Sequence, residues 1–229
     1  MRRNGIKREE LFISSKLRNS QQQYEKALKA FDESRKALGV DYLDMYMIHF
    51  PCPACGLYTE AWRALEHLYK EGYARAIGVS NFHQTHLEKI FAMCEIPPMV
   101  NELECNPYLS IAPLRQYCHE HQIWPEAWFP LGGPATRLSG KAVGGKRLLE
   151  DGLLIGLGAK YGKSPAQIAL RWELQSDIIA IPKSAKPHRI RENIDIFGFE
   201  LSESDMAAID SLDCGQRSGS DPETCNDQF

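Results

Sequence analysis

Short apolar runs alternate along this chain with longer segments in which apolar residues recur every three or four positions. The first kind of run is typical of buried strands and the second of amphipathic helices. We predict strands at residues 11–17, 43–50, 76–81, 99–104, within 123–131, and at 178–181. We predict helices after Ser20 as far as Gly39, around 62–72, 87–91, 114–119 and 164–172, and from Pro187 and Ser202 onward. The Gly-rich residues 132–146 are expected to form a loop.

Two capping boxes mark predicted helix starts. Ser20 precedes Gln23, and Ser164 precedes Pro165 and Gln167. A hydroxyl three residues before a Gln satisfies two backbone N–H groups reciprocally, and Pro suits the first helical position. Both places are therefore predicted to begin helices.

The alternation of strands and helices predicts a parallel sheet covered by helices. Two closures compete, an open doubly wound sheet and a (β/α)8 barrel. No G-x-G-x-x-G follows any strand, which weakens the open dinucleotide-binding sheet. Polar residues such as Lys16, His49 and Lys183 follow the strands instead, and a barrel gathers such strand ends on one active-site rim. The pattern therefore favours an α/β fold of the (β/α)8 TIM-barrel type, incomplete, with about six of its eight β-α units present.

Composition excludes several classes of protein. The chain has 229 residues, of which 43% are apolar and 25% charged, as in soluble globular proteins. Its net charge of −3 argues against a nucleic-acid surface, which needs a basic excess. No apolar run approaches the ~18 residues of a membrane span, and no apolar stretch follows the N-terminus as in a secretory signal. Seven scattered cysteines do not form a disulfide framework, so we expect a reducing, cytoplasmic location.

Residues 178–193 combine features of an anion site. A short apolar strand is followed by Lys183 and Ser184, and Pro187 then opens a helix that carries Arg189. Free N–H groups at a helix start and fixed cations bind phosphate well. The alternative is a solvated basic first turn, and this stretch alone leaves the two interpretations open.

Five segments together resemble the aldo-keto reductase family, and they occur in that family's order over about residues 1–213. They are R-E-E-L-F-I-S-S-K-L (8–17), Y-M-I-H-F-P (46–51), G-V-S-N-F (78–82), V-N-E-L-E-C-N-P-Y-L (100–109), and I-P-K-S with R-I-R-E-N (181–184, 189–193). The resemblance implies a (β/α)8 barrel that reduces aldehydes or ketones with NADPH. It implies a small carbonyl substrate as the partner, while composition and charge leave no membrane or nucleic-acid partner expected.

The resemblance also implies roles for particular residues. Lys16 and His49 match the family's catalytic Lys and His. The implied cofactor-binding residues are Ser80, Asn81, Glu102 and Phe129 around the nicotinamide, Lys183, Ser184 and Arg189 at the 2′-phosphate, Glu192 and Asn193 near the adenine, and Leu131. No metal site is implied.

The sequence departs from the family before Lys16. The family's proton-donating Tyr and its Asp precede this Lys, but the fifteen residues before Lys16 contain neither. We therefore expect a barrel lacking its first two units at 1–213 and a loose tail at 214–229. Such a chain would have little reductase activity, and its open edge would favour self-association. The alternative function is a non-catalytic barrel remnant that binds a nucleotide or another subunit; the other possibility is that the protein is longer than this sequence.

Three substitutions modify the expected site. Glu102 stands where the family usually has Gln, and a carboxylate accepts hydrogen bonds but cannot donate them. Phe129 replaces a Tyr and keeps its stacking face. Arg18 stands where a Trp often lines the substrate pocket, and we interpret it as facing solvent.

Two further pairs of residues carry possible chemistry. Cys52 and Cys55 form a C-x-x-C just after His49, which is a redox pair, half of a metal site or an incidental loop pair. We favour the incidental pair because no second C-x-x-C is present. His83 and His86 share a predicted helix face, and without a third ligand we interpret both as exposed.

Overall fold

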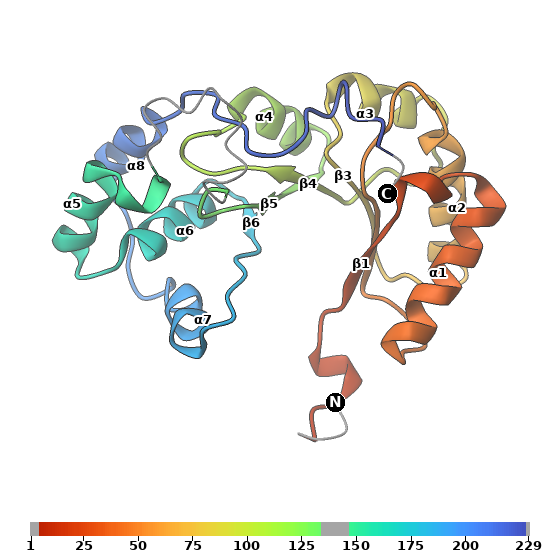
Figure 1. Cartoon of the computed structure of the whole chain (residues 1–229), viewed down its shortest axis with the longest axis horizontal. Helices are drawn as coiled ribbons and strands as arrows, with labels where there is room; N and C mark the ends of the chain where they lie inside the picture. Colours follow the sequence, from red (N-terminus) through yellow and green to blue (C-terminus); the bar gives the residue numbers. More distant parts are fainter. Residues whose placement is uncertain (1–4, 134–146, 228–229) are drawn as a thin grey trace. The chain divides into compact units, whose positions relative to one another are not determined.

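Six parallel strands form the sheet of the computed structural model, which describes residues 5–133 and 147–227 (Figure 1). They are β1 Ser14–Leu17, β2 Met45–Ile48, β3 Ile77–Ser80, β4 Val100–Glu104, β5 Trp124–Trp128 and β6 Ile179–Ala180. They are arranged in the sheet in chain order. The α/β class is therefore confirmed, whereas an incomplete barrel of eight units stays a prediction. Residues 134–146 of the expected loop lie outside the described residues.

The chain divides into two compact units, which are described one at a time. The first, unit 1, contains Met1–Asn101 and Pro222–Phe229, and the second, unit 2, contains Glu102–Asp221. The predicted division into a barrel at 1–213 and a loose tail at 214–229 stays a prediction.

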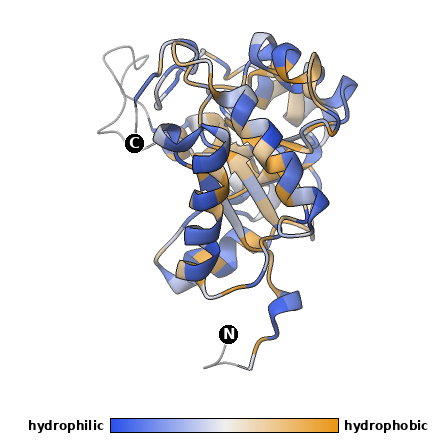
Figure 2. Cartoon of the chain, turned by 90° about the vertical axis from the view of Figure 1, so that its right-hand side faces the viewer, coloured by the Kyte–Doolittle hydropathy of each residue, from blue (hydrophilic) through white to orange (hydrophobic). Residues whose placement is uncertain are grey.

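Helices of unit 1 pack on its strands through aromatic side chains. They are α1 Tyr24–Leu38, α2 Tyr58–Lys70 and α3 Gln84–Phe91. Phe31 of α1 meets Tyr46 of β2 edge to face, with ring centroids 5.0 Å apart. Both rings are buried, and such pairs add to the free energy gained from area burial. Figure 2 shows mostly hydrophobic strands behind helices whose outer surfaces are hydrophilic.

Close packing inside unit 1 also explains a glycine. A Cβ added to Gly78 on β3 would lie 2.7 Å from the backbone oxygen of Val100. The backbone oxygen cannot move aside as the end of a flexible side chain can. Any side chain at position 78 would therefore displace the strand that contains Val100.

One predicted helix start is wrong. The capping box at Ser20 does not form, because Asn19–Gln21 is a short 3-10 helix and α1 begins at Tyr24. The side chain of Gln22 is buried, and its Nε2 donates to the Phe50 oxygen at 2.6 Å. This contact between distant residues fixes the chain before the helix, and the local pattern could not predict it.

Helices of unit 2 surround a second apolar core. They are α4 Ala112–Glu120, α5 Gly152–Tyr161, α6 Pro165–Gln175, α7 Pro187–Ile194 and α8 Glu203–Asp210. Trp172 of α6, fully buried, is central to this core, together with Ile168 and Ile209. The predicted capping box at Ser164 is confirmed, with Ser164 and Gln167 each bonded to the other's backbone.

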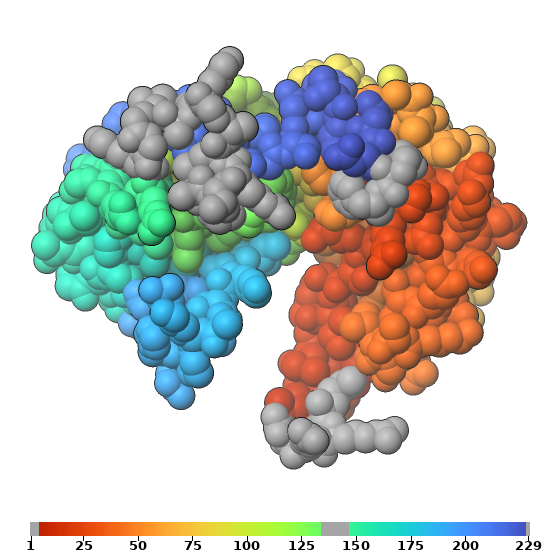
Figure 3. Space-filling view, viewed as in Figure 1, coloured from red at the N-terminus to blue at the C-terminus, as the bar shows by residue number. Residues whose placement is uncertain are grey.

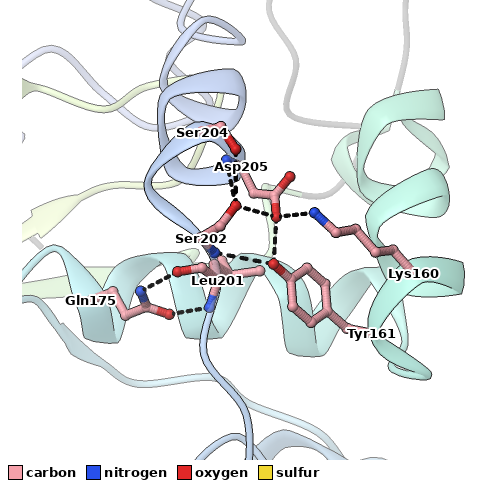
Figure 4. Close-up of polar contacts among 7 residues, drawn as sticks. All are labelled: Lys160, Tyr161, Gln175, Leu201, Ser202, Ser204 and Asp205. Atoms are coloured by element: carbon pink, nitrogen blue, oxygen red, sulfur yellow. Dashed lines mark hydrogen bonds and ion pairs between the residues drawn. The ribbon is translucent and has the colours of Figure 1, made fainter.

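A polar cluster joins α5 to the start of α8 (Figure 4). Asp205 Oδ2 accepts hydrogen bonds from Lys160 Nζ at 2.6 Å, Ser202 Oγ at 2.7 Å and the Tyr161 hydroxyl. The bond from Lys160, followed by those from Tyr161 and Ser202, holds the pKa of Asp205 well below its usual range. Ser202 is the N-cap of α8, so the cluster fixes where that helix begins.

No helix among the described residues is long and apolar enough to cross a membrane.

Candidate functional site

Three polar residues of unit 1 lie at the same edge of its sheet. Lys16 is on β1, His49 directly follows β2, and Ser80 ends β3. Leu17 pairs with Ile48, and Ile48 pairs with Val79, so the three strands end in register. The carboxyl ends of parallel strands thus bring together the two predicted catalytic residues and one predicted cofactor ligand.

The imidazole of His49 is neutral at physiological pH. Burial lowers its pKa to about 4, and the positive charge of Lys16 contributes to the shift. A neutral imidazole has one N–H donor and one acceptor nitrogen. His49 can therefore donate a hydrogen bond to a substrate oxygen without carrying a charge, beside a lysine that does carry one.

Asn81 shapes the turn after β3. Its backbone is left-handed, with φ of 64°, a conformation that Asn tolerates better than most residues. Its Nδ2 donates to the His49 carbonyl oxygen at 3.1 Å and to Ser80 Oγ at 3.0 Å. Ser80 and Asn81 are both buried. One amide group therefore links the ends of β2 and β3.

Asn101 is a further residue of this edge, and the sequence motifs did not single it out. It is fully buried on β4. Its Oδ1 accepts from the Phe82 backbone N–H at 3.3 Å, and its Nδ2 donates to the Phe82 oxygen at 2.8 Å. Both polar groups of one backbone residue are thus satisfied, which holds the turn that carries Asn81. The signal available in the sequence was a polar residue inside a buried strand.

A cavity of about 420 Å³ lies in unit 2. Six predicted residues line it: Leu131, Lys183, Ser184, Arg189, Glu192 and Asn193. Its remaining walls are Leu149, His188, and Ser164, Pro165 and Ala166 at the start of α6.

The chemistry of this cavity suits an anion. The Lys186 backbone N–H donates to Ser184 Oγ at 3.1 Å, and α7 begins at Pro187. The cavity therefore holds the first turns of a helix, whose N–H groups point toward the helix start, together with two cationic side chains, Lys183 and Arg189. The same helix also contributes the carboxylate of Glu192, which offsets part of the repulsion between the two cations.

Two predicted cofactor residues of unit 2 do not line that cavity. Glu102 is buried on β4, with 4% of its surface exposed. Phe129 follows β5 with a left-handed backbone at φ of 54°, and its carbonyl oxygen accepts from Asn106 Nδ2 at 3.4 Å. For a bulky side chain this backbone is strained, and such strain is concentrated at functional sites.

Glu104, two residues beyond Glu102, has a different role. Its carboxylate accepts from the Ser218 backbone N–H at 2.6 Å and from the Gly219 backbone N–H at 2.9 Å. Gly219 lies so close to Trp128 that an added Cβ would be 2.3 Å from its ring. Glu104 therefore anchors residues 218–219.

Comparison with known proteins gives consistent matches. A sequence profile of the aldo/keto reductase family matches residues 1–213. A glyoxal reductase of Bacillus subtilis (strain 168) is 47% identical over 223 residues, which are 97% of this chain and 76% of the relative. That relative is longer than this chain, which spans about three quarters of its length.

Two solved structures are also similar. A mutant of Gox0644 in complex with NADPH has a TM-score of 0.85 at 39% identity, and the match covers 95% of this chain and 76% of that one. An aldo-keto reductase of Bombyx mori in complex with NADP has a TM-score of 0.85 at 36% identity, covering 95% and 73%.

Proposed function

Because the chain belongs to the aldo/keto reductase family, we propose that it is an NADPH-dependent oxidoreductase that reduces aldehydes and ketones to alcohols. The observation that carries this proposal is the cavity in which Lys183, Ser184 and Arg189 meet at the start of α7. Two cations, a hydroxyl and a helix N-terminus suit the 2′-phosphate that distinguishes NADPH from NADH. The solved relatives in complex with NADPH and NADP support the same cofactor.

The residues around the cavity would hold the adenosine end of NADPH. Lys183, Ser184 and Arg189 would bind the 2′-phosphate, with Glu192 and Asn193 beside the adenine and Leu131 as an apolar wall. Ser80, Asn81 and Glu102 would bind the nicotinamide carboxamide, and the ring of Phe129 would stack on the nicotinamide.

The bound cofactor supplies the hydride to the carbonyl carbon. The protein side chains act on the carbonyl oxygen, which must be oriented, stabilised and protonated. The neutral imidazole of His49 would donate a hydrogen bond that orients the carbonyl oxygen. The positive charge of Lys16 would stabilise the negative charge that develops on that oxygen. A proton must then reach the oxygen to complete the alcohol.

Delivery of that proton separates two candidate functions, catalytic reduction of a carbonyl and binding of NADPH alone. In the family a Tyr donates this proton, and without it the carbonyl is not converted to the alcohol. The cavity proposed for the 2′-phosphate, here called the phosphate cavity, lies within unit 2, so nucleotide binding does not require the proton donor. Binding of NADPH without catalysis is therefore the second candidate function. Carbonyl-dependent oxidation of NADPH, followed at a saturating concentration of cofactor, separates the two functions.

The binding proposal is tested with two neighbouring arginines. Arg189 lines the cavity and Arg191, on the same helix, does not. Arg189→Ala is expected to weaken NADPH binding about 10- to 100-fold, the value of a lost charge-assisted hydrogen bond. Arg191→Ala is the matched control and should leave the Kd nearly unchanged. Fluorescence titration measures both, and equal weakening by the two variants would contradict the proposal.

We propose small, reactive aldehydes as the first substrates to test, because the glyoxal reductase is a close relative. The test measures kcat/KM for glyoxal, a simple aldehyde and a ketone, and ranks the three as substrates. A reducing cytoplasm is the proposed location, since none of the seven cysteines forms a disulfide.

Self-association is proposed through an apolar surface of unit 2. A groove of about 1000 Å³ runs along β6 and α7. Several of its side chains are large, apolar and exposed: Trp124, Ile179, Ile190, Ile194 and Phe197. Exposed apolar groups gathered in this way mark interaction surfaces. Light scattering during size exclusion tests this, with a concentration-dependent dimer expected and Ile194→Glu expected to give a monomer.

A further inference from the structure

The C-terminal residues 222–227 belong to unit 1 and are bonded to its N-terminal part at several points. The Ala54 backbone N–H donates to Asn226 Oδ1 at 2.9 Å, and Asn19 Nδ2 donates to the Asp227 carbonyl oxygen at 2.8 Å. Figure 3 shows these dark-blue residues lying against the orange segment that follows β2. The end of the chain and the loop after His49 are therefore neighbours.

A carboxylate and two histidines form another attachment. Glu223 Oε1 lies 2.7 Å from His83 Nδ1, and its Oε2 lies 3.6 Å from His86 Nε2. The interpretation of both histidines as exposed is wrong for His86, which is buried. His86 Nδ1 accepts from the His83 backbone N–H at 3.1 Å, so its Nε2 carries the proton that points toward the carboxylate.

Between these attachments lies a cluster of thiols. Cys52 and Cys225 are both buried, and with Phe50 they form one small apolar cluster. Cys55 is exposed, and its backbone N–H donates to the Cys52 carbonyl oxygen at 2.9 Å in a tight turn. Three thiols from two segments far apart in the sequence are therefore gathered beside the loop that carries His49.

The two thiols of the C-x-x-C differ in reactivity. Burial raises the pKa of the Cys52 thiol to about 12, and the neighbouring Cys225 and Cys55 contribute. A buried thiol of this kind rarely ionises and is a slow first nucleophile, whereas an exposed thiol reacts with solutes directly. Cys55 is thus the accessible entry point, and Cys52 and Cys225 are the protected pair.

We propose that these three cysteines form a thiol–disulfide site that reacts with a low-molecular-weight disulfide and ends in a bond between Cys52 and Cys225. The bond ties the C-terminal residues to the loop after β2. The function as a reductase is not needed for this reaction, so the two proposals succeed or fail separately.

The reaction proceeds by three exchanges. The Cys55 thiolate attacks one sulfur of the small disulfide, whose S–S bond breaks and releases one small thiol. The Cys52 sulfur then displaces the second small thiol from Cys55 and forms a Cys52–Cys55 bond. Cys225 attacks the Cys52 sulfur, and Cys55 leaves as a thiol. Two protein thiols are oxidised, and one small disulfide is reduced to two thiols, which take up the two protons.

Peptide mapping of the full chain tests the pairing. The protein is treated with oxidised glutathione, its remaining thiols are blocked with N-ethylmaleimide, and it is digested with trypsin. Cys52 and Cys55 share the peptide 37–63, and Cys225 lies on the peptide 218–229. Mass spectrometry should find these two peptides joined, and a reducing thiol should separate them.

Variants assign the three roles. Cys225→Ser and, should its hydroxyl disturb the cluster, Cys225→Ala should abolish the joined peptides. Cys55→Ser should keep them and slow their formation about tenfold or more, because the accessible thiol is lost. Cys214→Ser, outside the cluster, is the control and should behave as the natural chain.

Two results would overturn the proposal. One is complete labelling of Cys225 by N-ethylmaleimide after oxidation, with only a Cys52–Cys55 bond or a glutathione adduct on Cys55. The other is persistence of the joined peptides in Cys52→Ser, which would assign the bond to Cys55 and Cys225. Circular dichroism of each reduced variant confirms that it is folded before either result is read.

Discussion

The positive charge of Lys16 lies close enough to His49 to lower the pKa of its imidazole, in addition to the larger effect of burial. Lys16 lies on β1 and His49 directly follows the adjacent β2, so the two residues lie at the same edge of the sheet. A permanent cation beside a neutral donor is an arrangement suited to an oxygen that gains negative charge.

Removal of the lysine charge should raise the pKa of His49. Lys16→Met removes one of the two causes that hold it at about 4, while burial, the larger cause, remains. We expect an increase of up to about one unit, measured from the imidazole C–H resonance in an NMR titration. Lys26→Met, on an exposed position of α1, is the control. An unchanged pKa of His49 in Lys16→Met would show that the Lys16 charge does not affect the imidazole.

His49 should also make the fold less stable in mild acid. Its folded pKa of about 4 is below the ordinary 6.5, so the unfolded chain binds more protons between these values. Stability is therefore full above about pH 6.5 and declines as the pH falls toward 4. After discounting for partial exposure, we expect about 2 kcal/mol from this residue. Urea denaturation from pH 7 to 4 measures the decline, which His49→Gln should reduce.

Glu173 should have the opposite pH dependence. It is fully buried in α6, burial raises its pKa well above the ordinary value, and neither carboxyl oxygen has a hydrogen-bond partner among the described residues. The folded chain holds this proton where the unfolded chain has lost it, so stability declines as pH rises above about 4.5. Glu173→Gln, neutral and of equal size, should remove that decline. Urea denaturation from pH 5 to 8 checks it, and a decline retained in full by the variant would contradict the prediction.

Asn101 should be essential to the turn after β3. Asn101→Ala leaves the Phe82 backbone N–H and carbonyl oxygen without their buried partner. Each unsatisfied group costs about 1–3 kcal/mol, so the unfolding free energy should fall by about 2–6 kcal/mol. Gln84→Ala, which removes only an exposed bond to Glu88, should cost less than about 0.5 kcal/mol. Equal effects of the two substitutions, compared by urea denaturation, would contradict the role of Asn101.

NADPH should be preferred to NADH only while the cations of the cavity are present. Lys183→Met removes one charge from the cavity and should weaken NADPH binding about tenfold while NADH binding changes little. The ratio of the two Kd values measures the effect independently of folding. A proportional loss for both cofactors would place Lys183 away from the 2′-phosphate.

Local patterns predicted most elements of the fold. Runs of apolar residues located all six strands, and Ser164 located the start of α6 because its capping bonds involve only residues three apart. Helix α5 was missed, since its sequence G-L-L-I-G-L-G-A-K-Y is apolar nearly throughout and has three glycines in place of a periodic polar face. The available signal was Asp151, whose side chain accepts from the Leu153 N–H at 2.8 Å.

Contacts between distant residues limited the prediction of the site. Lys183, Ser184 and Arg189 are close in sequence, so their shared cavity could be expected. Asn101 holds Phe82, and Glu104 holds Ser218 and Gly219, across long stretches of chain. No local pattern reveals such bonds, and they depend on strands and turns that the whole unit positions.

The capping box of α6 has a consequence for ligand binding, because Ser164, Pro165 and Ala166 also form a wall of the phosphate cavity. The first turn of a helix is ordinarily its most frayed part. A ligand in the cavity would contact that turn and suppress its fraying, so opening of α6 and release of the ligand become linked equilibria. Amide hydrogen exchange at the first turn of α6 would then slow in proportion to the occupancy of the cavity. The exchange rate at this helix end would therefore measure ligand binding.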